Sequence, residues 1–515
     1  MKRKVHAGVV ILRVRQIFLS LLRHISAKTS WPVYWRTVIE EMGGGIVKLA
    51  QILALRYEIL PPRYRKEFAN LFDHLKPFSK EDLLAVFREE FGKGPEEIFQ
   101  EFSYNPYACA SFGQVHIALL SGRKVAVKVQ KPHVQRLACV DIVLLKALMW
   151  AGSIFFLTPV NLRDATREWE VWTLRELDYR FEAQKAISLR ALHFAHSELG
   201  SYCYIPEVFS EYCTSRVAVF EFLEGWSLND IIHRRTLELS DVMRERISSC
   251  VVQTQMLQYI LGGSYQADPH PGNIILLEDG RIGYIDFGIT GEVGNAQEQY
   301  HFVHFIKGAA EGNMKGVVAH FKSMTMGDAF SRETLKGLKY TWRKKSLQKI
   351  EKASMRFLEH KLGGIIERWT ADVANTQEGF YSRSTARHFI SFISMARRYG
   401  LEVPLGILSF IRAVIIADTV CLAINPQFNM QKELRHFFIQ RAQLLATSLQ
   451  DPSLSAKTGP IATAGSLQES EGKREREVEE RQRLVERYLS YAERIVESIV
   501  EEGSRGLAYF ATTKI

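Results

Sequence analysis

One stretch, ADPHPGNIILLEDGRIGYIDFG at residues 267–288, constrains this chain more than any other part of it. Its two apolar runs, IILLE and RIGYI, are joined by Asp-Gly, which is typical of a β-hairpin. Asp268 and Asn273 stand in a loop before the hairpin, and Asp286 follows its second strand. Carboxylate and amide oxygens are the ligands that Mg²⁺ prefers in proteins. The stretch therefore predicts two loops, held together by a hairpin, that carry three oxygen-bearing side chains.

The order of these residues indicates phosphoryl transfer. Asp-x-x-x-x-Asn followed by Asp-Phe-Gly is the arrangement of the catalytic and metal-binding loops of kinases. Transfer from ATP needs metal ions, a lysine on the phosphates and a carboxylate near the attacking hydroxyl. We predict that Asn273 and Asp286 hold Mg²⁺, and that Asp268 orients or deprotonates the acceptor. Asp-Phe-Gly alone is a weak signal, because it occurs by chance in long chains, but its combination with an upstream lysine is specific.

The upstream lysine is Lys128, in the strand-like run VAVKVQ. Val125, Val127 and Val129 alternate with it, so Lys128 stands on the opposite face of the strand. The run is close to the V-A-I-K pattern of the kinase strand whose lysine contacts phosphates. We predict that Lys128 contacts the phosphates of ATP; the competing interpretation is a solvated surface lysine.

A glutamate on the following helix is expected to fix this lysine. The run RELDYRFEAQ offers Glu176, Asp178 and Glu182. Asp178 and Glu182 are one helical turn apart and share a face, whereas Glu176 points elsewhere. Spacing alone does not choose among the three, and each is also compatible with an ordinary solvated carboxylate.

The whole chain has the composition of a globular protein and is long enough for two or more lobes. Lys and Arg outnumber Asp and Glu by 67 to 57, which suits phosphate ligands or anionic lipid. The basic residues form no single aromatic-rich stripe, so we expect no nucleic-acid partner. Six scattered cysteines without C-x-x-C spacing indicate neither a structural metal nor a disulfide framework, and hence a reducing compartment. No stretch is expected to span a membrane, including the apolar run ALMWAGSIFFLTPVNL, which we interpret as a buried helix.

The periodicity predicts an α+β chain with mostly helical ends. VHIALL and RKVAVKVQ, separated by Ser-Gly, predict a hairpin, and YIPEVF and RVAVFEFLEG predict two more strands. Everything beyond Gln297 is expected to be helical to about residue 450. A stripe at 3–4 spacing from Leu484 to Ile499 predicts a helix that binds a partner, a second copy or its own chain. The predicted segments are a helical extension (1–100), a small lobe with the sheet (101–225), a helical lobe (226–450), a flexible linker (451–468) and a charged amphipathic tail helix (469–515).

These motifs together resemble the UbiB family of atypical kinase-like proteins, also called aarF-domain kinases, over roughly residues 38–430. ACASFGQVH resembles the alanine-rich loop that replaces a glycine-rich loop in that family. ELDYRFEA resembles its E-x-D motif and DPHPGN its catalytic loop. The run from Lys48 to Gln51 is similar to its K-x-G-Q motif, with Ala50 in place of glycine.

The resemblance implies a bilobal protein-kinase-like fold that binds ATP and Mg²⁺. It implies that Glu182 pairs with Lys128, and that Glu176 and Asp178 face Lys48 and Gln51 of an extension that covers the acceptor site. The residues implied to contact nucleotide are Ala108, Ala110, Ser111, Lys128, Glu221 and Leu223. Gln266, where the family usually has histidine, is a departure, because glutamine hydrogen-bonds but does not titrate.

The function implied is that of an Mg-dependent ATPase or kinase-like factor for ubiquinone or other isoprenoid-lipid biosynthesis. Its implied partners are membrane lipid, quinone precursors and quinone-biosynthesis proteins. The chain lacks the paired membrane spans of some members, so we expect a cytoplasmic protein attached peripherally to the inner face of a membrane through its basic N-terminal helix. Two alternatives stay open: a kinase that phosphorylates a protein or small molecule in trans, and a nucleotide-gated scaffold without turnover.

Overall fold

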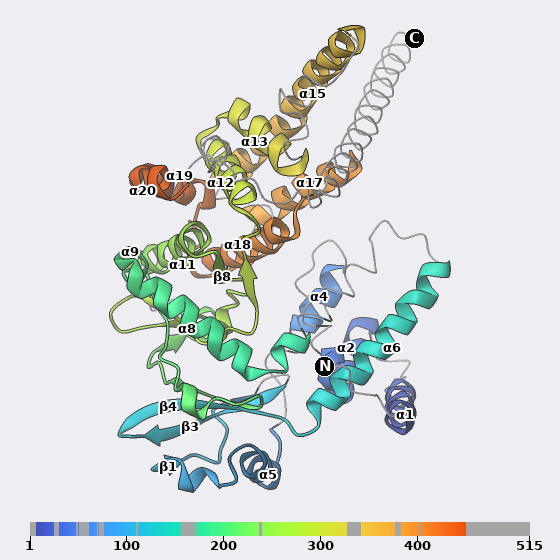
Figure 1. Cartoon of the computed structure of the whole chain (residues 1–515), viewed down its shortest axis with the longest axis vertical. Helices are drawn as coiled ribbons and strands as arrows, with labels where there is room; N and C mark the ends of the chain where they lie inside the picture. Colours follow the sequence, from blue (N-terminus) through green and yellow to red (C-terminus); the bar gives the residue numbers. More distant parts are fainter. Residues whose placement is uncertain are drawn as a thin grey trace, which may run out of the picture. The chain divides into compact units, whose positions relative to one another are not determined.

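The computed structural model describes residues 7–24, 30–47, 50, 61–69, 71, 77–109, 112–155, 170, 173–235, 239–326, 341–375, 383–399, 401 and 403–449 (Figure 1). The predicted linker 451–468 and tail helix 469–515 lie outside the described residues. The chain forms two compact units. The N-terminal unit runs to Ala191 and includes 204–224 and 283–289, and the C-terminal unit contains 192–203, 225–282 and the chain from Thr290 onward.

An antiparallel sheet forms the centre of the N-terminal unit. Its strands lie in the order β1 (Glu101–Phe102), β3 (Gly113–Leu120), β4 (Arg123–Gln130) and β6 (Val217–Glu221), and β2 (Ala108–Cys109) also pairs with β3. Ser121 and Gly122 connect β3 to β4 with φ values of 50° and 76°. Positive φ at both residues gives the turn the twist of the flanking strands. The hairpin predicted from Ser-Gly is therefore confirmed.

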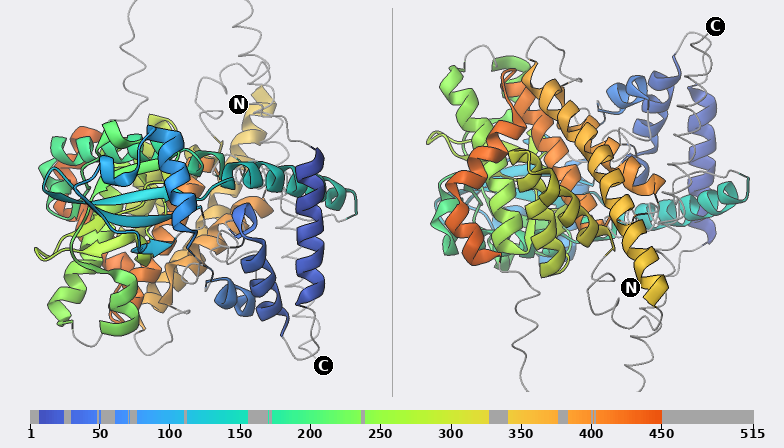
Figure 2. Two further views of the ribbon diagram at one scale, coloured as in Figure 1. Left: turned by 90° about the horizontal axis from the view of Figure 1, so that it is seen from below. Right: turned by 90° about the horizontal axis from the view of Figure 1, so that it is seen from above.

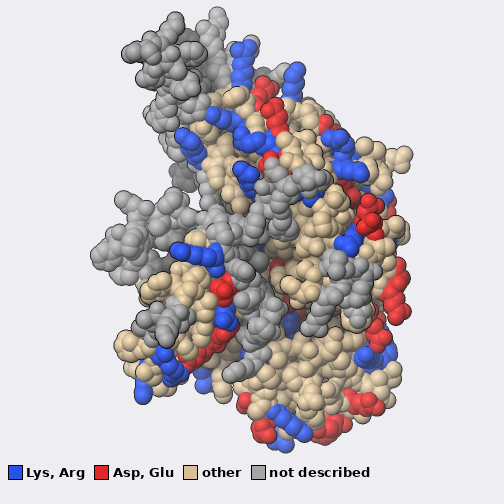
Figure 3. Space-filling model, turned by 180° about the vertical axis from the view of Figure 1, so that it is seen from behind, with Lys and Arg blue, Asp and Glu red and all other residues tan. Residues whose placement is uncertain are grey.

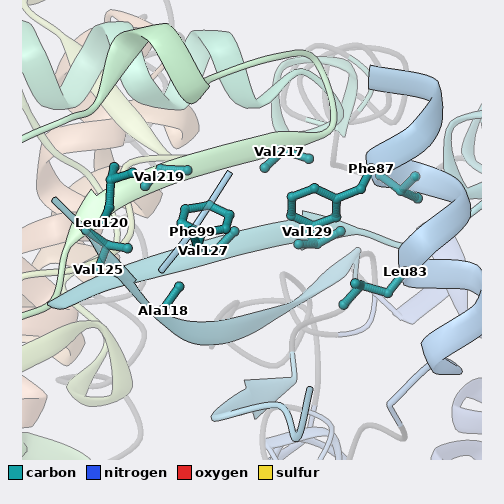
Figure 4. Packing of buried hydrophobic residues seen from close by; sticks show 11 residues of the cluster. Leu83, Phe87, Phe99, Ala118, Leu120, Val125, Val127, Val129, Val217 and Val219 are labelled. Atoms are coloured by element: carbon teal, nitrogen blue, oxygen red, sulfur yellow. The ribbon is translucent and has the colours of Figure 1, made fainter. Parts of the chain in front are cut away.

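One face of this sheet is a hydrophobic core. Val125, Val127 and Val129 of β4 are fully buried and belong to one hydrophobic cluster with Phe87 of α5 (Lys80–Phe91), whose ring lies beside Val129 in Figure 4. Burying a side chain of this kind stabilises the fold by about 1.5–3 kcal/mol. Because side chains alternate along a strand, Lys128 stands on the other face, as predicted.

The first helix of the N-terminal unit, α1 (Ala7–Arg23), is fixed by a buried ion pair. Arg13 donates from Nε and Nη2 to the two carboxylate oxygens of Asp141 on α6 (Val134–Phe155), over 2.7 and 2.9 Å. Its Nη1 also donates to the Met42 carbonyl at the end of α2 (Trp31–Met42). Figure 2 shows α1, in dark blue, crossing α6, in teal. One arginine thus joins three helices of the unit, to which α4 (Pro62–Ala69) also belongs.

The C-terminal unit is mostly helical, as predicted for the chain beyond Gln297. Its long helix α11 (Asp241–Gly262) packs against α18 (Leu405–Ile424), where the rings of Tyr259 and Phe410 lie 4.0 Å apart. Its other elements are α9 (Ser197–Gly200), β7 (Trp226–Ser227), α10 (Leu228–Asp230), η4 (Ile231–Arg235), β8 (Ser264–Gln266), η6 (Pro271–Asn273), β9 (Ile274–Leu276), β11 (Thr290–Glu292), α12 (Ala296–Glu311), α13 (Met314–Met326), α15 (Thr341–Ala374), α17 (Thr385–Arg398), α19 (Met430–Gln440) and α20 (Ala442–Ser448). With the antiparallel sheet, these helices confirm the α+β class.

The hairpin predicted between IILLE and RIGYI is also confirmed. Strand β9 is followed by a turn in which the Leu277 N–H donates to the Arg281 carbonyl over 2.9 Å. Gly280 takes a φ of 79° in this turn, which explains the Asp-Gly pair. Strand β10 (Ile282–Tyr284) comes next.

The strand predicted for YIPEVF is wrong in most of its length. Only its first residue is in a strand, β5 (Cys203–Tyr204), and Val208 makes one isolated bridge to Phe220. Pro206 has no N–H to give to a ladder, so a strand does not continue through it.

One described helix, α18, is long and apolar enough to cross a membrane by length and composition. Buried residues make up 72% of its apolar window, however, as in the core helix of a folded domain. The apolar run from Ala147 onward begins in α6, and the burial of its later side chains lies outside the described residues. On the face drawn in Figure 3, basic and acidic side chains are interspersed.

Candidate functional site

Lys128 and Glu182 form the central contact of the site in the N-terminal unit. Lys128 comes from β4 and Glu182 from the first turn of α8 (Tyr179–Ala195). The ammonium group lies 2.7 and 2.9 Å from the two carboxylate oxygens. The side chains are only 13% and 4% exposed. Such a bidentate, charge-assisted contact fixes the direction in which the lysine points.

The Asp-Phe-Gly segment is held beside this ion pair. Asp286 Oδ2 lies 3.4 Å from Lys128 Nζ, and the Phe287 N–H donates to Glu182 Oε1 over 3.3 Å. The Gly288 N–H donates to Asp286 Oδ1 over 2.8 Å, and the buried Phe287 ring stacks on Phe220. The carboxylate of Asp286 is therefore oriented by its own loop through Oδ1 and faces the lysine with Oδ2.

The charges of the pair are set by burial and by each other. Burial acts to lower the pKa of Lys128, but the carboxylates of Asp286 and Glu182 outweigh it and raise this pKa well above its usual value. Burial raises the pKa of the Glu182 carboxyl, and the nearby Lys128 ammonium opposes this rise. Lys128 thus stays an ammonium ion at every physiological pH, as a phosphate-binding lysine must.

Asp178 and Glu176 have other neighbours. Asp178 is 39% exposed and pairs with Arg180 over 2.8 Å, and this hydrogen bond lowers its pKa. Glu176 lies beside the Asp-Phe-Gly segment, since a Cβ added to Gly288 would meet its Cγ at 3.5 Å. Lys48 and Gln51 lie outside the described residues, so the contact expected of them with Glu176 and Asp178 stays a prediction.

Sequence reasoning missed Tyr179, which lies between Asp178 and Glu182 in the sequence. Its buried ring is 5.4 Å from Lys128 Nζ, and burial raises the pKa of its hydroxyl. Gly113 packs against it: an added Cβ would fall 2.5 Å from the Val129 carbonyl and closer still to the Tyr179 hydroxyl. The lone glycine of ACASFGQVH therefore allows this close approach. The spacing of ELDY gave no signal that its tyrosine faces the lysine.

The other predicted nucleotide contacts lie near these strands. Ala108 is exposed on β2, and Ala110 and Ser111 lie outside the described residues. Glu221 ends β6, and its carboxylate is occupied by the Tyr204 hydroxyl (2.9 Å) and the Glu207 N–H (3.0 Å). Leu223 comes two residues later and is half-buried. Both hydrogen bonds of Glu221 end on its Oε2, and the contact of Glu221 and Leu223 with a nucleotide stays a prediction.

The C-terminal unit carries Asp268 and Asn273 in one loop. Asn273 Nδ2 donates to the Asp268 carbonyl over 3.3 Å, and its N–H donates to the His270 carbonyl over 2.8 Å. Asp268 Oδ1 is buried and accepts no hydrogen bond from any described residue. A buried carboxylate oxygen without a donor is costly, and it is expected where a substrate proton or hydroxyl binds.

The chemistry of each unit suits Mg-ATP. In the N-terminal unit the Lys128 ammonium suits phosphate, and the Asp286 carboxylate suits Mg²⁺, which usually takes one or two carboxylates plus phosphate oxygens. In the C-terminal unit Asn273 offers an amide oxygen of the kind that Mg²⁺ also takes. Within the described part of the chain, no group of three His, Cys, Asp or Glu side chains is placed to hold a metal ion alone.

Comparisons with known proteins show similarity to kinase-like proteins. Residues 70–321 match the family model described as the ABC1 atypical kinase-like domain. A chloroplastic aarF domain-containing protein kinase of Arabidopsis thaliana is 36% identical over 50% of this chain and 35% of its own length. Another such Arabidopsis protein is 28% identical over 78% of this chain and 74% of its own length.

Among solved structures, a Mycobacterium tuberculosis protein in complex with erythromycin has a TM-score of 0.48 and 20% identity. That match covers 84% of this chain and 97% of the other. The chain spans about a third of the length of the first curated relatives it matches.

Proposed function

Since the chain belongs to the ABC1 (aarF/UbiB) family of atypical kinase-like proteins, we propose that it binds Mg-ATP and transfers the terminal phosphoryl group to water or to an acceptor. The observation that carries the proposal is the bidentate contact of Lys128 with Glu182, with Asp286 facing the same ammonium group. A lysine fixed by a buried glutamate beside Asp-Phe-Gly is the arrangement that nucleotide phosphates require.

Each residue has a role that follows from its surroundings. Lys128 holds the α and β phosphates, and Glu182 fixes its direction. Asn273 and Asp286 hold magnesium, which when bound neutralises phosphate charge. Asp268 orients the attacking water or hydroxyl and accepts its proton at the buried Oδ1, which has no donor among the described residues. Backbone groups from Glu221 to Leu223 contact the base.

A thermal melt with ATP and Mg²⁺ tests nucleotide binding. A ligand at about a hundred times its Kd adds roughly 2.7 kcal/mol of stability, which shifts the midpoint by a few degrees. We expect this shift in wild type, its loss in Asp286→Asn, and its retention in Asp279→Asn, a control in the turn of the preceding hairpin whose carboxylate pairs with Arg281 at the surface. No shift in wild type at saturating nucleotide would refute the proposal.

We also propose that the protein works at a membrane surface, in the biosynthesis of ubiquinone or another isoprenoid lipid. Support for the membrane surface comes from α1, whose exposed face is apolar: Ile11 is 67% exposed, Phe18 58% and Leu22 52%. These residues repeat at helical spacing around Arg15, on the face opposite the buried Arg13. A helix with an apolar face and basic residues, without acidic ones, suits the surface of an anionic bilayer.

Vesicle flotation tests this attachment. We expect wild type to float with vesicles that contain anionic lipid and Phe18→Glu to stay behind. Val242→Glu, which changes a residue 77% exposed on α11, serves as the control and should float. Equal flotation of both variants would contradict attachment through α1.

A further inference from the structure

A buried chain of hydrogen bonds in the C-terminal unit ends at the backbone just before Asp268. His193 Nδ1 lies 3.2 Å from the Cys203 carbonyl oxygen, and His193 Nε2 lies 3.1 Å from Gln258 Nε2. Gln258 Oε1 in turn accepts the N–H of Gln266 over 2.9 Å. The three side chains are between 0% and 8% exposed, so water does not compete for these bonds.

The hydrogen-bond partners of His193 and Gln258 permit only one placement of their hydrogen atoms. A backbone carbonyl only accepts, so His193 Nδ1 must carry its hydrogen. Neutral imidazole then has a bare Nε2, which accepts from the amide nitrogen of Gln258. At the other end, the Gln266 N–H only donates, so it requires the amide oxygen of Gln258. Both ends therefore demand the same orientation of the Gln258 amide.

The surroundings of His193 keep it neutral. Burial lowers its pKa to about 4, and the Cys203 carbonyl opposes this only in part. No charged side chain among the described residues contributes to this pKa. A proton on Nε2 would face the Gln258 N–H, turn the amide over and leave the Gln266 N–H without its acceptor.

We propose that His193 and Gln258 are positioning residues that hold the loop of Asp268 in its reactive place. The proposal rests on the proposed function, since it gives Asp268 its role. Gln266 is the last residue of β8, where it pairs with Thr290 of β11, and Asp268 follows two residues later. With Asn273 bound to the Asp268 carbonyl, the loop is held on both sides of the carboxylate.

Positioning of this kind affects turnover more than nucleotide binding. A displacement of about 1 Å at a reacting group can cost on the order of a hundredfold in rate. We expect Gln258→Leu to lower kcat for ATP hydrolysis by about tenfold to a hundredfold and to leave KM for ATP within about twofold. Gln253→Leu is the matched control: Gln253 is equally buried on α11, but its amide donates to Glu433 of α19.

A change of charge gives the sharper test. In Gln258→Glu the carboxylate still accepts the Gln266 N–H, but it has no hydrogen for His193 Nε2. The chain of bonds then closes only when an added proton lies between the carboxylate and His193. We expect kcat of Gln258→Glu, relative to wild type, to fall by about tenfold or more from pH 6 to pH 9 at saturating Mg-ATP. Wild type has no such fall from this histidine, because His193 is already neutral throughout this range.

Hydrogen exchange measures the same contact without turnover. We expect the Gln266 amide of Gln258→Leu to exchange about tenfold faster than in wild type, and that of Gln253→Leu to exchange at the wild-type rate. The proposal is overturned if Gln258→Leu matches Gln253→Leu in exchange, or if Gln258→Glu keeps the wild-type pH profile. If wild type shows no turnover but the variants show this exchange pattern, the proposed transfer reaction is refuted. The hydrogen-bond chain itself is then still supported.

Discussion

Replacing Glu182 by glutamine should weaken both the fold and the nucleotide site. The change removes a negative charge that is 4% exposed and contacts the Lys128 ammonium through both oxygens. The new amide group would turn a donor toward the ammonium. Breaking a buried pair by removing one partner typically costs about 3–5 kcal/mol.

The remaining neighbour of Lys128 reduces this cost. Asp286 Oδ2 lies 3.4 Å away and still neutralises the lysine, so we expect a loss of about 2–3 kcal/mol in the free energy of unfolding of the apo protein. Since the pKa of Lys128 is raised well above its usual value and burial raises that of Glu182 to about 7, this loss should be constant only above the Glu182 pKa, between about pH 8 and pH 9. Urea unfolding measures it, with Glu89→Gln as the control, because Glu89 is 66% exposed in its pair with Arg216.

The same variant should bind Mg-ATP less tightly. Lys128 without Glu182 is drawn to Asp286, which then no longer offers a free carboxylate. A tenfold weaker affinity would reduce the stabilisation at a fixed ligand concentration from roughly 2.7 to about 1.4 kcal/mol. The reasoning is refuted if Glu182→Gln unfolds at the same urea concentration as Glu89→Gln, or if its thermal shift with Mg-ATP equals that of wild type.

Three further predictions follow from other buried groups. Burial raises the pKa of Asp418 to about 6, so the folded state binds this proton more tightly than the unfolded chain and stability falls as pH rises from about 4 to about 6. Asp418→Asn should therefore gain up to about 3 kcal/mol on wild type over this range in urea unfolding; a constant difference would contradict this. Asp141→Asn leaves Arg13 buried without its charge partner, so hydrogen exchange in α1 should rise by at least about a hundredfold, while exchange in α18 stays unchanged. Gly113→Ala forces a Cβ against backbone and should lower stability by about 1–3 kcal/mol, whereas Gly8→Ala, in helix α1 with open space around its Cα and no positive φ, should cost no stability in the same melt.

The sequence predicted those features that depend on local pattern. The alternation of three valines predicted that Lys128 lies on the face of β4 opposite the hydrophobic core. The Ser-Gly pair predicted the turn before that strand. The choice of the partner of Lys128 lay beyond local pattern, which predicts Asp178 and Glu182 on one helical face. In the structure α8 begins at Tyr179, so Asp178 precedes the helix and pairs locally with Arg180. Glu182 lies in the first turn of α8 and is buried against the Phe287 backbone, a contact between distant segments that no local pattern predicts.

Contacts between distant segments gave no sequence signal at all. His193 and Gln258 belong to two helices far apart in the chain, and neither stands in a motif. A buried histidine and a buried glutamine each have many local explanations. The orientation of both side chains is fixed only by the groups at the two ends of the chain of bonds. The Cys203 carbonyl must accept a hydrogen bond, and the Gln266 N–H must donate one. The strand predicted for YIPEVF is wrong for a local reason, because Pro206 has no N–H for a ladder whatever the apolar pattern around it.

The two compact units hold their charged groups by separate means, which leads to a last prediction. Glu182 fixes Lys128 within the N-terminal unit, and Gln258 fixes the backbone before Asp268 within the C-terminal unit. Among the residues that the structure describes, the two share no hydrogen-bond partner. Their effects on apo stability should therefore add within about 0.5 kcal/mol in the double variant Glu182→Gln with Gln258→Leu. Their effects on kcat should not add, since groups that serve one reaction lose most of their effect together. Additive losses in both quantities would show that the two residues do not serve a common reaction, and the proposed division of roles would then be wrong.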